Sequence, residues 1–359
     1  MDPDRKHIAE SRHAFIMREV ELRGTVRIGE IAQRLGVNDV TIRRDIIELD
    51  RRGQLTRVHG GAVRSDATTK VEAGKLLIGV IVPNISTNCT SIVRGMEVHA
   101  RSARARLVLG SSHNEVETEQ QCVDRMVGLG VSGIVIAPTV RGTTLDAVSR
   151  RATSIPVPVV VLERDLSNVL DGNRLDNVRV DRNHGVALAL RHFQRLGHDA
   201  VALAIYDSVL VADQIRDGFH GAAAHLGLTH EIDVSLPYAS ERSEDLTGAI
   251  EKLLARCAES GTTALLVHAE GHAGRIVDVA LNLGIRIPED LAIVSYDDIH
   301  ADLAAVPLTS VSHPNAELGR EALTLLVDRI DDVRTSSTPR HIMLLPELTI
   351  RSSCAAAVA

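Results

Sequence analysis

The chain has 359 residues, of which 44% are apolar, 24% charged and 2% aromatic, so two or three domains are expected and few rings could stack on a sugar or a base. Its four scattered cysteines form no C-x-x-C pair, which argues against a zinc ribbon or a disulfide framework. The net charge of −7 is uneven, because residues 1–65 hold 13 Lys and Arg against 10 Asp and Glu while the remainder carries −10. A locally basic segment suggests that only this part approaches a polyanion, although drift in surface charge would look the same.

The chain divides by composition into three segments. Residues 1–65, called the head below, contain short helical patterns and a Gly-rich end. Residues 66–75 are small and polar, and are expected to be a linker. Residues 76–359, called the body below, alternate β-branched runs with helical patterns.

Three helices are predicted in the head. The first covers Arg12–Arg23, and the second covers Ile28–Leu35, where apolar residues recur at i, i+3, i+4 and i+7. Gly36 ends the second helix with the tight turn that a helix-turn-helix needs. Asn38 is expected to cap the third helix. The apolar face of this helix consists of Ile42, Ile46 and Leu49.

The opposite face of the third helix is predicted to be exposed, with Val40, Thr41 and Arg44 on it and Arg43 on its flank. Arginine and threonine near a helix N-terminus are what a recognition helix presents to the major groove. Residues 54–63 then form two β-like pieces around a Gly-Gly pair, typical of a wing that contacts phosphate or the minor groove. The alternative is a plain three-helix bundle with a solvated charged face.

The string GVNDVTIRRDIIELD at residues 36–50, followed by GQLTRVHGGA at 53–62, resembles the DeoR-type winged helix-turn-helix signature. The resemblance covers about fifty residues, and Asn38 stands where that family often has Ser. It implies binding to double-stranded operator DNA through the recognition helix and the wing. The residues expected to contact DNA are Arg27, Asn38, Val40, Thr41, Arg43, Arg44, Arg57, His59 and Gly60.

Short apolar runs in the body predict strands of a parallel sheet that helices cover on both faces. These runs are Leu76–Val82, Ala105–Leu109, Gly133–Ala137, Val157–Leu162, Ala200–Ile205, Ala264–Val267 and Leu291–Ser295.

Motifs along nearly all of residues 76–353 resemble, in order, those of the LacI family and its periplasmic sugar-binding relatives. They include Ile78–Asn84 at the first strand, Val160–Arg164 at a strand that usually ends in Asp-Arg, and Val180–Gly185 at the crossing between lobes. The resemblance implies a two-lobed, doubly wound α/β domain of the periplasmic-binding-protein type behind the small winged helix-turn-helix domain.

The implied lobe boundaries place about 76–179 and 309–332 in the first lobe. The second lobe is expected to contain about 180–308 and 333–353.

Ligands of open α/β sheets bind outside the carboxyl ends of the strands. Carboxylate, amide and guanidinium groups suit the hydroxyls of a polyol, so a small polar effector, a sugar or sugar derivative, is expected. Arg216, in a segment that resembles the R-x-G-F helix start of the family, is the leading candidate contact. Each residue could instead be a surface charge or a helix cap, as for Asp181 at the lobe crossing. The residues expected to bind the effector are Asn84, Glu163, Arg164, Arg216, Glu270 and Asp297.

Nothing in the sequence favours catalysis or a metal. His268 and His272 are four residues apart, but the intervening Glu270 is one position late for a zinc protease motif and the segment lies at a strand-to-helix junction. No P-loop, dinucleotide fingerprint or nucleophile elbow occurs. No cofactor, no metal and no catalytic residue is therefore expected.

The main hypothesis is a cytoplasmic transcription regulator, a repressor or alternatively an activator, that binds operator DNA as a homodimer or a tetramer and responds to a sugar-like effector. A charged N-terminus with no apolar run after it, and no run of about 18 apolar residues, leave no expectation of a secretion signal or a membrane span. The alternatives are a solute-binding protein for transport and a sugar-converting enzyme. Residues 66–75 contain no recognisable LacI-type hinge helix, so that family's switching mechanism is not carried over.

Overall fold

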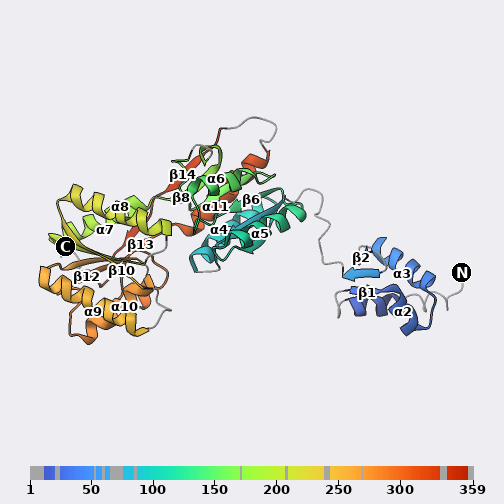
Figure 1. Ribbon diagram of the computed structural model, residues 1–359, viewed down its shortest axis with the longest axis horizontal. Coiled ribbons are helices and arrows are strands. Elements are labelled where there is room, and N and C mark those ends of the chain that lie inside the picture. Colours follow the sequence, from blue (N-terminus) through green and yellow to red (C-terminus); the bar gives the residue numbers. More distant parts are fainter. Residues whose placement is uncertain are drawn as a thin grey trace. The chain divides into compact units, whose positions relative to one another are not determined.

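Figure 1 shows the computed structural model, which describes residues 12–20, 25–51, 54–58, 61–64, 76–84, 87–169, 172–206, 209–237, 243–268, 270–331 and 338–354. The chain divides into two compact units, Met1–Lys75 and Leu76–Ala359. Within the described residues, no helix is long and apolar enough to cross a membrane.

The described part of the head contains three helices and a small sheet. A helix over residues 12–20 is followed by β1 (Thr25–Arg27), α2 (Ile28–Leu35) and α3 (Asp39–Arg51). β2 (Leu55–Val58) and β3 (Gly61–Arg64) pair antiparallel, and the sheet order is β1-β3-β2. β1 is a finding that the apolar pattern did not predict. The helix-turn-helix is confirmed, because α2 has the predicted bounds and Gly36 ends it with a φ of 63°.

The core of the head fixes the orientation of α3. Ile42, Ile46 and Leu49 are at most 1% exposed, as their spacing predicted. Asp45 on the same helix is also buried. Its carboxylate accepts hydrogen bonds from Nε of Arg12 at 2.8 Å and Nη2 of Arg12 at 3.1 Å, and it lies 3.2 Å from Nε2 of His13. These bonds attach the first helix to α3 on its buried side, so the opposite side remains free to meet DNA.

The body consists of two lobes, each built on a six-stranded sheet, so the predicted doubly wound, two-lobed α/β fold is confirmed. The first sheet has the order β14-β8-β7-β6-β4-β5 and all its pairings are parallel. Its strands are β4 (Leu76–Val82), β5 (Ala105–Ser111), β6 (Gly133–Ile136), β7 (Val159–Leu162), β8 (Asp176–Val180) and β14 (His341–Leu344).

The second sheet has the order β10-β9-β11-β12-β13-β15, and only the pairing of β13 with β15 is antiparallel. Its strands are β9 (Ala200–Tyr206), β10 (Thr229–Leu236), β11 (Ala264–His268), β12 (Ala292–Ser295), β13 (Thr309–Ser312) and β15 (Glu347–Thr349).

Helices cover both faces of each sheet (Figure 1). Side chains alternate along a strand, so Val80 belongs to the core under α4 and α11 while Ile81 belongs to the core under α5 and α6. In the first lobe these helices are α4 (Thr87–Ser102), α5 (Val116–Gly128), α6 (Leu145–Thr153) and α11 (Asn315–Asp331). In the second lobe they are α7 (Arg182–Arg195) and α8 (Val209–Leu226) on one face, and α9 (Ser243–Ser260) and α10 (Glu270–Asn282) on the other. Two short 3₁₀ helices cover Gly172–Arg174 and Ala301–Leu303.

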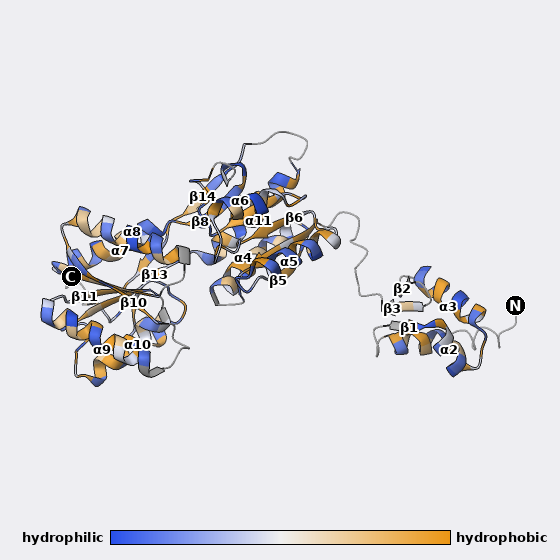
Figure 2. Cartoon of the chain, in the orientation of Figure 1, coloured by the Kyte–Doolittle hydropathy of each residue, from blue (hydrophilic) through white to orange (hydrophobic). Residues whose placement is uncertain are grey.

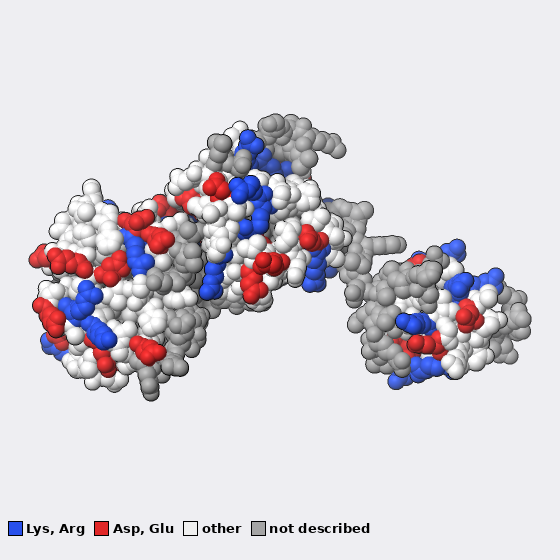
Figure 3. All heavy atoms as spheres, in the orientation of Figure 1, with Lys and Arg blue, Asp and Glu red and all other residues white. Residues whose placement is uncertain are grey.

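The apolar strands lie inside each lobe and polar residues cover the outer helix faces (Figure 2). On the face of the body drawn in Figure 3, acidic and basic side chains are interspersed over both lobes.

The expected lobe boundaries were wrong at two strands. β13 pairs with β12 and β15 and therefore belongs to the second lobe, whereas β14 pairs with β8 and belongs to the first. The resemblance that suggested the boundaries carries the order of motifs but not their hydrogen-bond partners. The chain crosses between the lobes three times, after β8, after β13 and between β14 and β15.

A close helix contact places the start of α11 beside α4. A Cβ atom on Gly95 would lie 2.0 Å from the carbonyl oxygen of Ala316, and one on Gly319 would lie 1.9 Å from that of Ile92. Only glycine permits this approach, which brings Asn315 next to Asn88 at the edge of the cleft described below.

Candidate functional site

The exposed face of α3 is the candidate DNA-contacting surface. Val40 is 71% exposed, Arg43 and Arg44 are exposed, and Thr41 is half-buried. An exposed valine among arginines suits a thymine methyl group beside the guanine and phosphate contacts that arginine makes. Arg27 is exposed at the start of α2.

Asn38 is the cap that the sequence predicted for α3. Its Oδ1 accepts hydrogen bonds from the backbone N–H of Thr41 at 2.8 Å and from the Thr41 hydroxyl at 2.7 Å. The cap holds the exposed first turn of the recognition helix, where base contacts are made in this class of DNA reader.

Only part of the expected wing falls within the described residues. His59, Gly60 and the linker at residues 66–75 lie outside the described residues, and so does the side chain of Arg57. The antiparallel pairing of Val58 with Gly61 shows that β2 and β3 form the hairpin on which these residues were expected.

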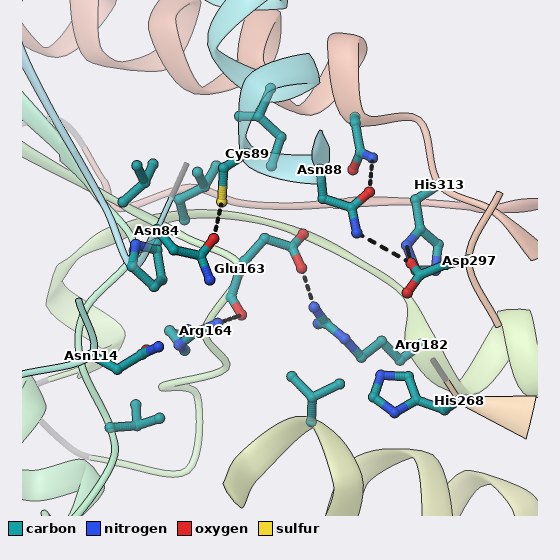
Figure 4. A pocket seen from close by; sticks show the side chains of 18 of the residues that line it. Asn84, Asn88, Cys89, Asn114, Glu163, Arg164, Arg182, His268, Asp297 and His313 are labelled. Carbon is teal, nitrogen blue, oxygen red and sulfur yellow. Dashed lines mark hydrogen bonds and ion pairs between the residues drawn. The ribbon is translucent and has the colours of Figure 1, made fainter. Parts of the chain in front are cut away.

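The body contains a cavity of about 500 Å³ between its two lobes, at the carboxyl ends of the central strands (Figure 4). Four expected residues line it, namely Asn84, Glu163, Arg164 and Asp297. Further polar and aromatic lining residues are Asn88, Asn114, Arg141, Arg182, Tyr206, His268, Tyr296, His313 and Asn315. Amides, charged groups and a few rings around a cleft of this size suit a small, hydroxyl-rich ligand.

Glu163 joins the ends of two strands at the base of this cleft. It follows β7 with a φ of 58°, a left-handed conformation that is strained for a residue with a Cβ. Its Oε1 accepts a hydrogen bond from the N–H of Val180 at the end of β8 at 3.0 Å, and its Oε2 is ion-paired with Arg182. The Glu163 carboxylate therefore has a bond to each of its oxygens before any ligand binds.

Arg182 is a largely buried cation of the cleft, with its side chain only 12% exposed. Desolvation is the largest single influence on the pKa of Arg182 and lowers it, but the charge and hydrogen bond of Glu163 together with Tyr296 and Asp297 outweigh it, so the pKa is raised. Tyr296 fixes the local backbone, because its hydroxyl donates to the carbonyl oxygen of Arg182 at 2.9 Å. Arg182 is the first residue of α7, so it lies where the chain enters the second lobe.

Arg164 is held by backbone oxygens. Its Nε donates to the carbonyl of Pro138 at 3.1 Å and its Nη1 to the carbonyl of Glu163 at 3.1 Å. Desolvation, followed by repulsion from Arg182, lowers the pKa of Arg164.

A polar network at the other end of the cleft connects the lobes. Nδ2 of Asn88, in the first lobe, donates to Oδ1 of Asp297, in the second lobe, at 3.4 Å. Nδ2 of Asn315 donates to Oδ1 of Asn88 at 2.9 Å, and Nδ1 of His313 lies 3.4 Å from Asp297 (Figure 4). The bond from Asn88 to Asp297 therefore joins the two lobes across the cleft.

Two buried histidines lie near these charges. Desolvation is the main cause that lowers the pKa of His268 to about 3 and that of His313 to about 4, and the charge of Arg182 adds to it in both cases. Both rings are therefore neutral at pH 7. Within the described residues, Nδ1 of His268 and Nε2 of His313 are buried and have no hydrogen-bond partner.

Arg216 is not among the described residues that line the cavity. Its Nε lies 3.2 Å from Asp233 and its Nη2 donates to the hydroxyl of Ser235 at 2.5 Å, both on β10. The preceding residue of α8, Ile215, is fully buried, and successive helix residues point about 100° apart. From the same helix Val211, not Arg216, lines the cavity. The side chain of Glu270 lies outside the described part of the chain.

His272, the second histidine of the pair that does not fit a zinc protease motif, contacts the backbone and an aromatic ring. Nε2 of His272 lies 2.9 Å from the carbonyl oxygen of Pro237, and its ring stacks on Tyr206. The described residues contain no group of three His, Cys, Asp or Glu that could hold a metal ion.

Sequence reasoning missed Arg182, His268 and His313 as candidate ligand contacts. His268 ends a predicted strand, and that position alone could have marked it. Arg182 follows β8 and His313 follows β13, and neither strand has a clear apolar pattern. β8 contains buried Asp176 and Asn177, and β13 has the sequence TSVS.

Comparison with known proteins gives the same two-part division. The DeoR-like helix-turn-helix domain matches residues 12–68, and the periplasmic binding protein-like domain matches residues 190–354. The arabinose metabolism transcriptional repressor of Geobacillus stearothermophilus is 29% identical over 337 residues, which cover 90% of this chain and 89% of that protein.

Two solved structures illustrate the shared fold. A LacI family regulator from Enterococcus faecium with bound ribose has a TM-score of 0.61 at 23% identity, over 78% of this chain and 98% of that one. The lac repressor dimer bound to operator has a TM-score of 0.64 at 20% identity, over 79% and 95%.

The head has the fold of a DNA-binding domain, and the body has the fold of a ligand-binding domain with a cleft between two lobes. More particularly, the head matches the DeoR-like helix-turn-helix domain, and the body matches the periplasmic binding protein-like domain and shares its fold with regulators of the LacI family.

Proposed function

We propose that this protein is a repressor whose affinity for operator DNA is controlled by a sugar or sugar derivative bound between the lobes of its body. The observation that carries the proposal is the polar cleft itself, where Asn88 of one lobe meets Asp297 of the other at 3.4 Å. A ligand that accepts and donates hydrogen bonds there would contact both lobes at once. Ribose and arabinose appear in the descriptions of two similar proteins, which supports this ligand class.

The effector is bound by residues that line the cleft. Asn84, Glu163, Arg164 and Asp297 retain the role expected from the sequence, and Arg182 and Asn88 join them. Arg216 is not included, because its guanidinium group is bonded to Asp233 and Ser235. Glu270 remains a candidate from the sequence alone.

Operator DNA is bound by the exposed face of α3 and by the wing. The contacts proposed for it are Arg27, Asn38, Val40, Thr41, Arg43, Arg44, Arg57, His59 and Gly60. A homodimer follows from the paired half-sites that helix-turn-helix proteins read, and the dimeric state of the lac repressor supports it. A regulator of this kind works in the cytoplasm, where its operator is.

Binding without conversion is favoured over the alternatives. A solute-binding protein has no use for a recognition helix, and the similar proteins reported above are transcription regulators. An enzyme would turn over its sugar, so incubation of the purified protein with a bound sugar should return the sugar unchanged.

The decisive experiment first selects an operator from random DNA duplexes with the full-length chain. Fluorescence anisotropy then measures the affinity for that duplex with and without each sugar of a panel. An effector can shift DNA affinity only as far as it binds the two conformations differently. We expect at least one sugar to change the DNA Kd of the wild type by tenfold or more. We expect Asp297→Ala to retain DNA binding without this response, and Arg44→Ala to lose DNA binding while still binding the sugar. DNA affinity that ignores every sugar bound by the body would refute the proposal.

A further inference from the structure

Among the described residues that line the cleft, arginines outnumber carboxylates. Arg141, Arg164 and Arg182 line it, against the carboxylates of Glu163 and Asp297. The two buried histidines do not change this balance at pH 7, because their pKa values are about 3 and 4.

Neither of these two carboxylates forms an ion pair with Arg164, although the charge of Glu163 partly offsets the fall in its pKa. Both oxygens of Glu163 are engaged, one by the N–H of Val180 and the other by Arg182. Asp297 is engaged by Asn88 and His313 at the opposite end of the cleft. Arg164 forms no ion pair within the described part of the chain, and its two hydrogen bonds go to backbone carbonyls.

A guanidinium group in such a place is costly without a counter-ion. Carbonyl dipoles hold its orientation but do not neutralise its charge, and removal from water disfavours the charged form. The lowered pKa of Arg164, caused mainly by desolvation and next by Arg182, agrees with this geometry. Arginine also has a planar fork of donors that matches the two oxygens of a carboxylate or a phosphate.

We infer that the effector carries an oxyanion, a carboxylate or a phosphate, which Arg164 binds at one end of the cleft while the hydroxyl groups reach Asp297 at the other. The inference rests on the function proposed above and narrows the ligand from any sugar to an acidic sugar derivative. Figure 4 shows the two ends, with Arg164 beside Asn84 and Asn114 and, across the cleft, Asp297 beside His313 and Asn88. The amide N–H groups of Asn84 and Asn114 could add donors to the anion, and Arg141 adds a second positive charge at the cleft.

The test compares neutral sugars with acidic derivatives of them on the wild-type chain. The probes are D-glucose, D-glucuronate and D-glucose 6-phosphate, together with L-arabinose, L-arabinonate, D-ribose and D-ribose 5-phosphate. Isothermal titration gives each Kd, and thermal shift ranks the panel, because a ligand that binds the folded state raises the Tm. We expect at least one acidic probe to bind tenfold or more tightly than its neutral partner. The carboxylate and phosphate members then distinguish the two sources of the oxyanion.

Variants identify the group responsible. Arg164→Gln should remove the preference for the acid while leaving weak binding of the neutral partner. Arg340→Gln, which removes an exposed arginine outside the cleft, is the matched control and should keep the preference. If Arg164→Gln does not fold, the wild-type comparison still tests whether the cleft prefers an acidic sugar, and Arg141→Gln tests whether the second arginine contributes to that preference.

Neutral sugars that bind as tightly as their acids would overturn this inference and leave the proposed function intact. A cleft that binds no member of the panel, neutral or acidic, would overturn both.

Discussion

Glu163 and Arg182 form an ion pair that ties the end of β7 to the first residue of α7, where the chain passes into the second lobe. The pair is largely shielded from water, since the side chains are 15% and 12% exposed. The ion pair therefore lines the cleft and also links β7, before the crossing, to α7, after it.

Removal of one member of this pair should destabilise the body. Glu163→Gln keeps an oxygen for the N–H of Val180 but leaves Arg182 buried without a counter-ion, so we expect a loss of about 3–5 kcal/mol. The three tyrosines all lie in the body, so urea unfolding followed by tyrosine fluorescence reports on this unit alone.

The matched control is Glu317→Gln, which breaks an exposed pair with Arg320 at 2.6 Å and should leave the urea midpoint unchanged. The double variant Glu163→Gln with Arg182→Gln removes both charges and should recover part of the loss. Equal urea midpoints for Glu163→Gln and the wild type would show that the ion pair does not stabilise the body.

Asn38 should separate helix capping from DNA contact. Asn38→Ala removes the oxygen that accepts from Thr41, so α3 should lose about 1 kcal/mol of stability. Asn38→Asp retains a capping oxygen and adds a negative charge, which favours the helix N-terminus but repels phosphate.

Hydrogen exchange of residues 39–51 in the full-length chain measures the first effect, and operator titration measures the second. We expect Asn38→Asp to keep wild-type protection and to bind DNA at least several-fold more weakly. Wild-type DNA affinity of Asn38→Asp would place residue 38 away from the phosphates.

Arg44 should contribute to specific DNA recognition. Arg44→Ala removes an exposed guanidinium from the first half of α3, and a lost bidentate base contact corresponds to roughly 10- to 100-fold in affinity. Arg51→Ala removes the same group from the last turn of α3, and is the control on the same helix.

Anisotropy titrations with the selected operator and with a scrambled duplex distinguish the two kinds of contact. Arg44→Ala should bind both duplexes with similar affinity, whereas Arg51→Ala should retain the preference for the operator. A variant at Arg44 that keeps the full preference would contradict the assignment of α3 as the reading helix.

The sequence predicted best those elements whose signal is local. α2 and Gly36 follow from apolar spacing and one left-handed turn, and β4 follows from one apolar run, so their bounds were confirmed. β8 and β10 were not predicted, because neither is a continuous apolar run. β8 also contains the buried Asp176, which is ion-paired with Arg329.

The cleft shows the same limit. Residues that lie two positions after the end of an apolar strand, such as Asn84 and Asp297, could be predicted because the carboxyl ends of parallel strands meet. Arg216 was expected at the cleft, but its guanidinium group is bonded to Asp233 and Ser235 on β10, a pairing that the sequence motif does not show. Arg182 depends on its pairing with Glu163 across two strands, a relationship that only the structure shows.

The buried histidines of the cleft should make the body less stable in mild acid. Their pKa values of about 4 for His313 and about 3 for His268 are lower than the ordinary value of 6.5, mainly because of desolvation. At a pH between these lowered pKa values and 6.5, the two histidines are protonated in the unfolded chain but not in the folded chain. The free energy of unfolding therefore falls as the pH is lowered from about 7 toward 4. At pH 5 each histidine should account for a loss of about 2 kcal/mol.

Urea midpoints at pH 7.5 and pH 5 measure this loss, and His313→Asn should reduce it by the share of that histidine. His225→Gln changes an exposed histidine of α8 and should leave the pH dependence as in the wild type. Because other groups titrate in the same range, the comparison is between variants, and an unchanged slope in His313→Asn would mean that this ring is already hydrated or paired when the protein is folded.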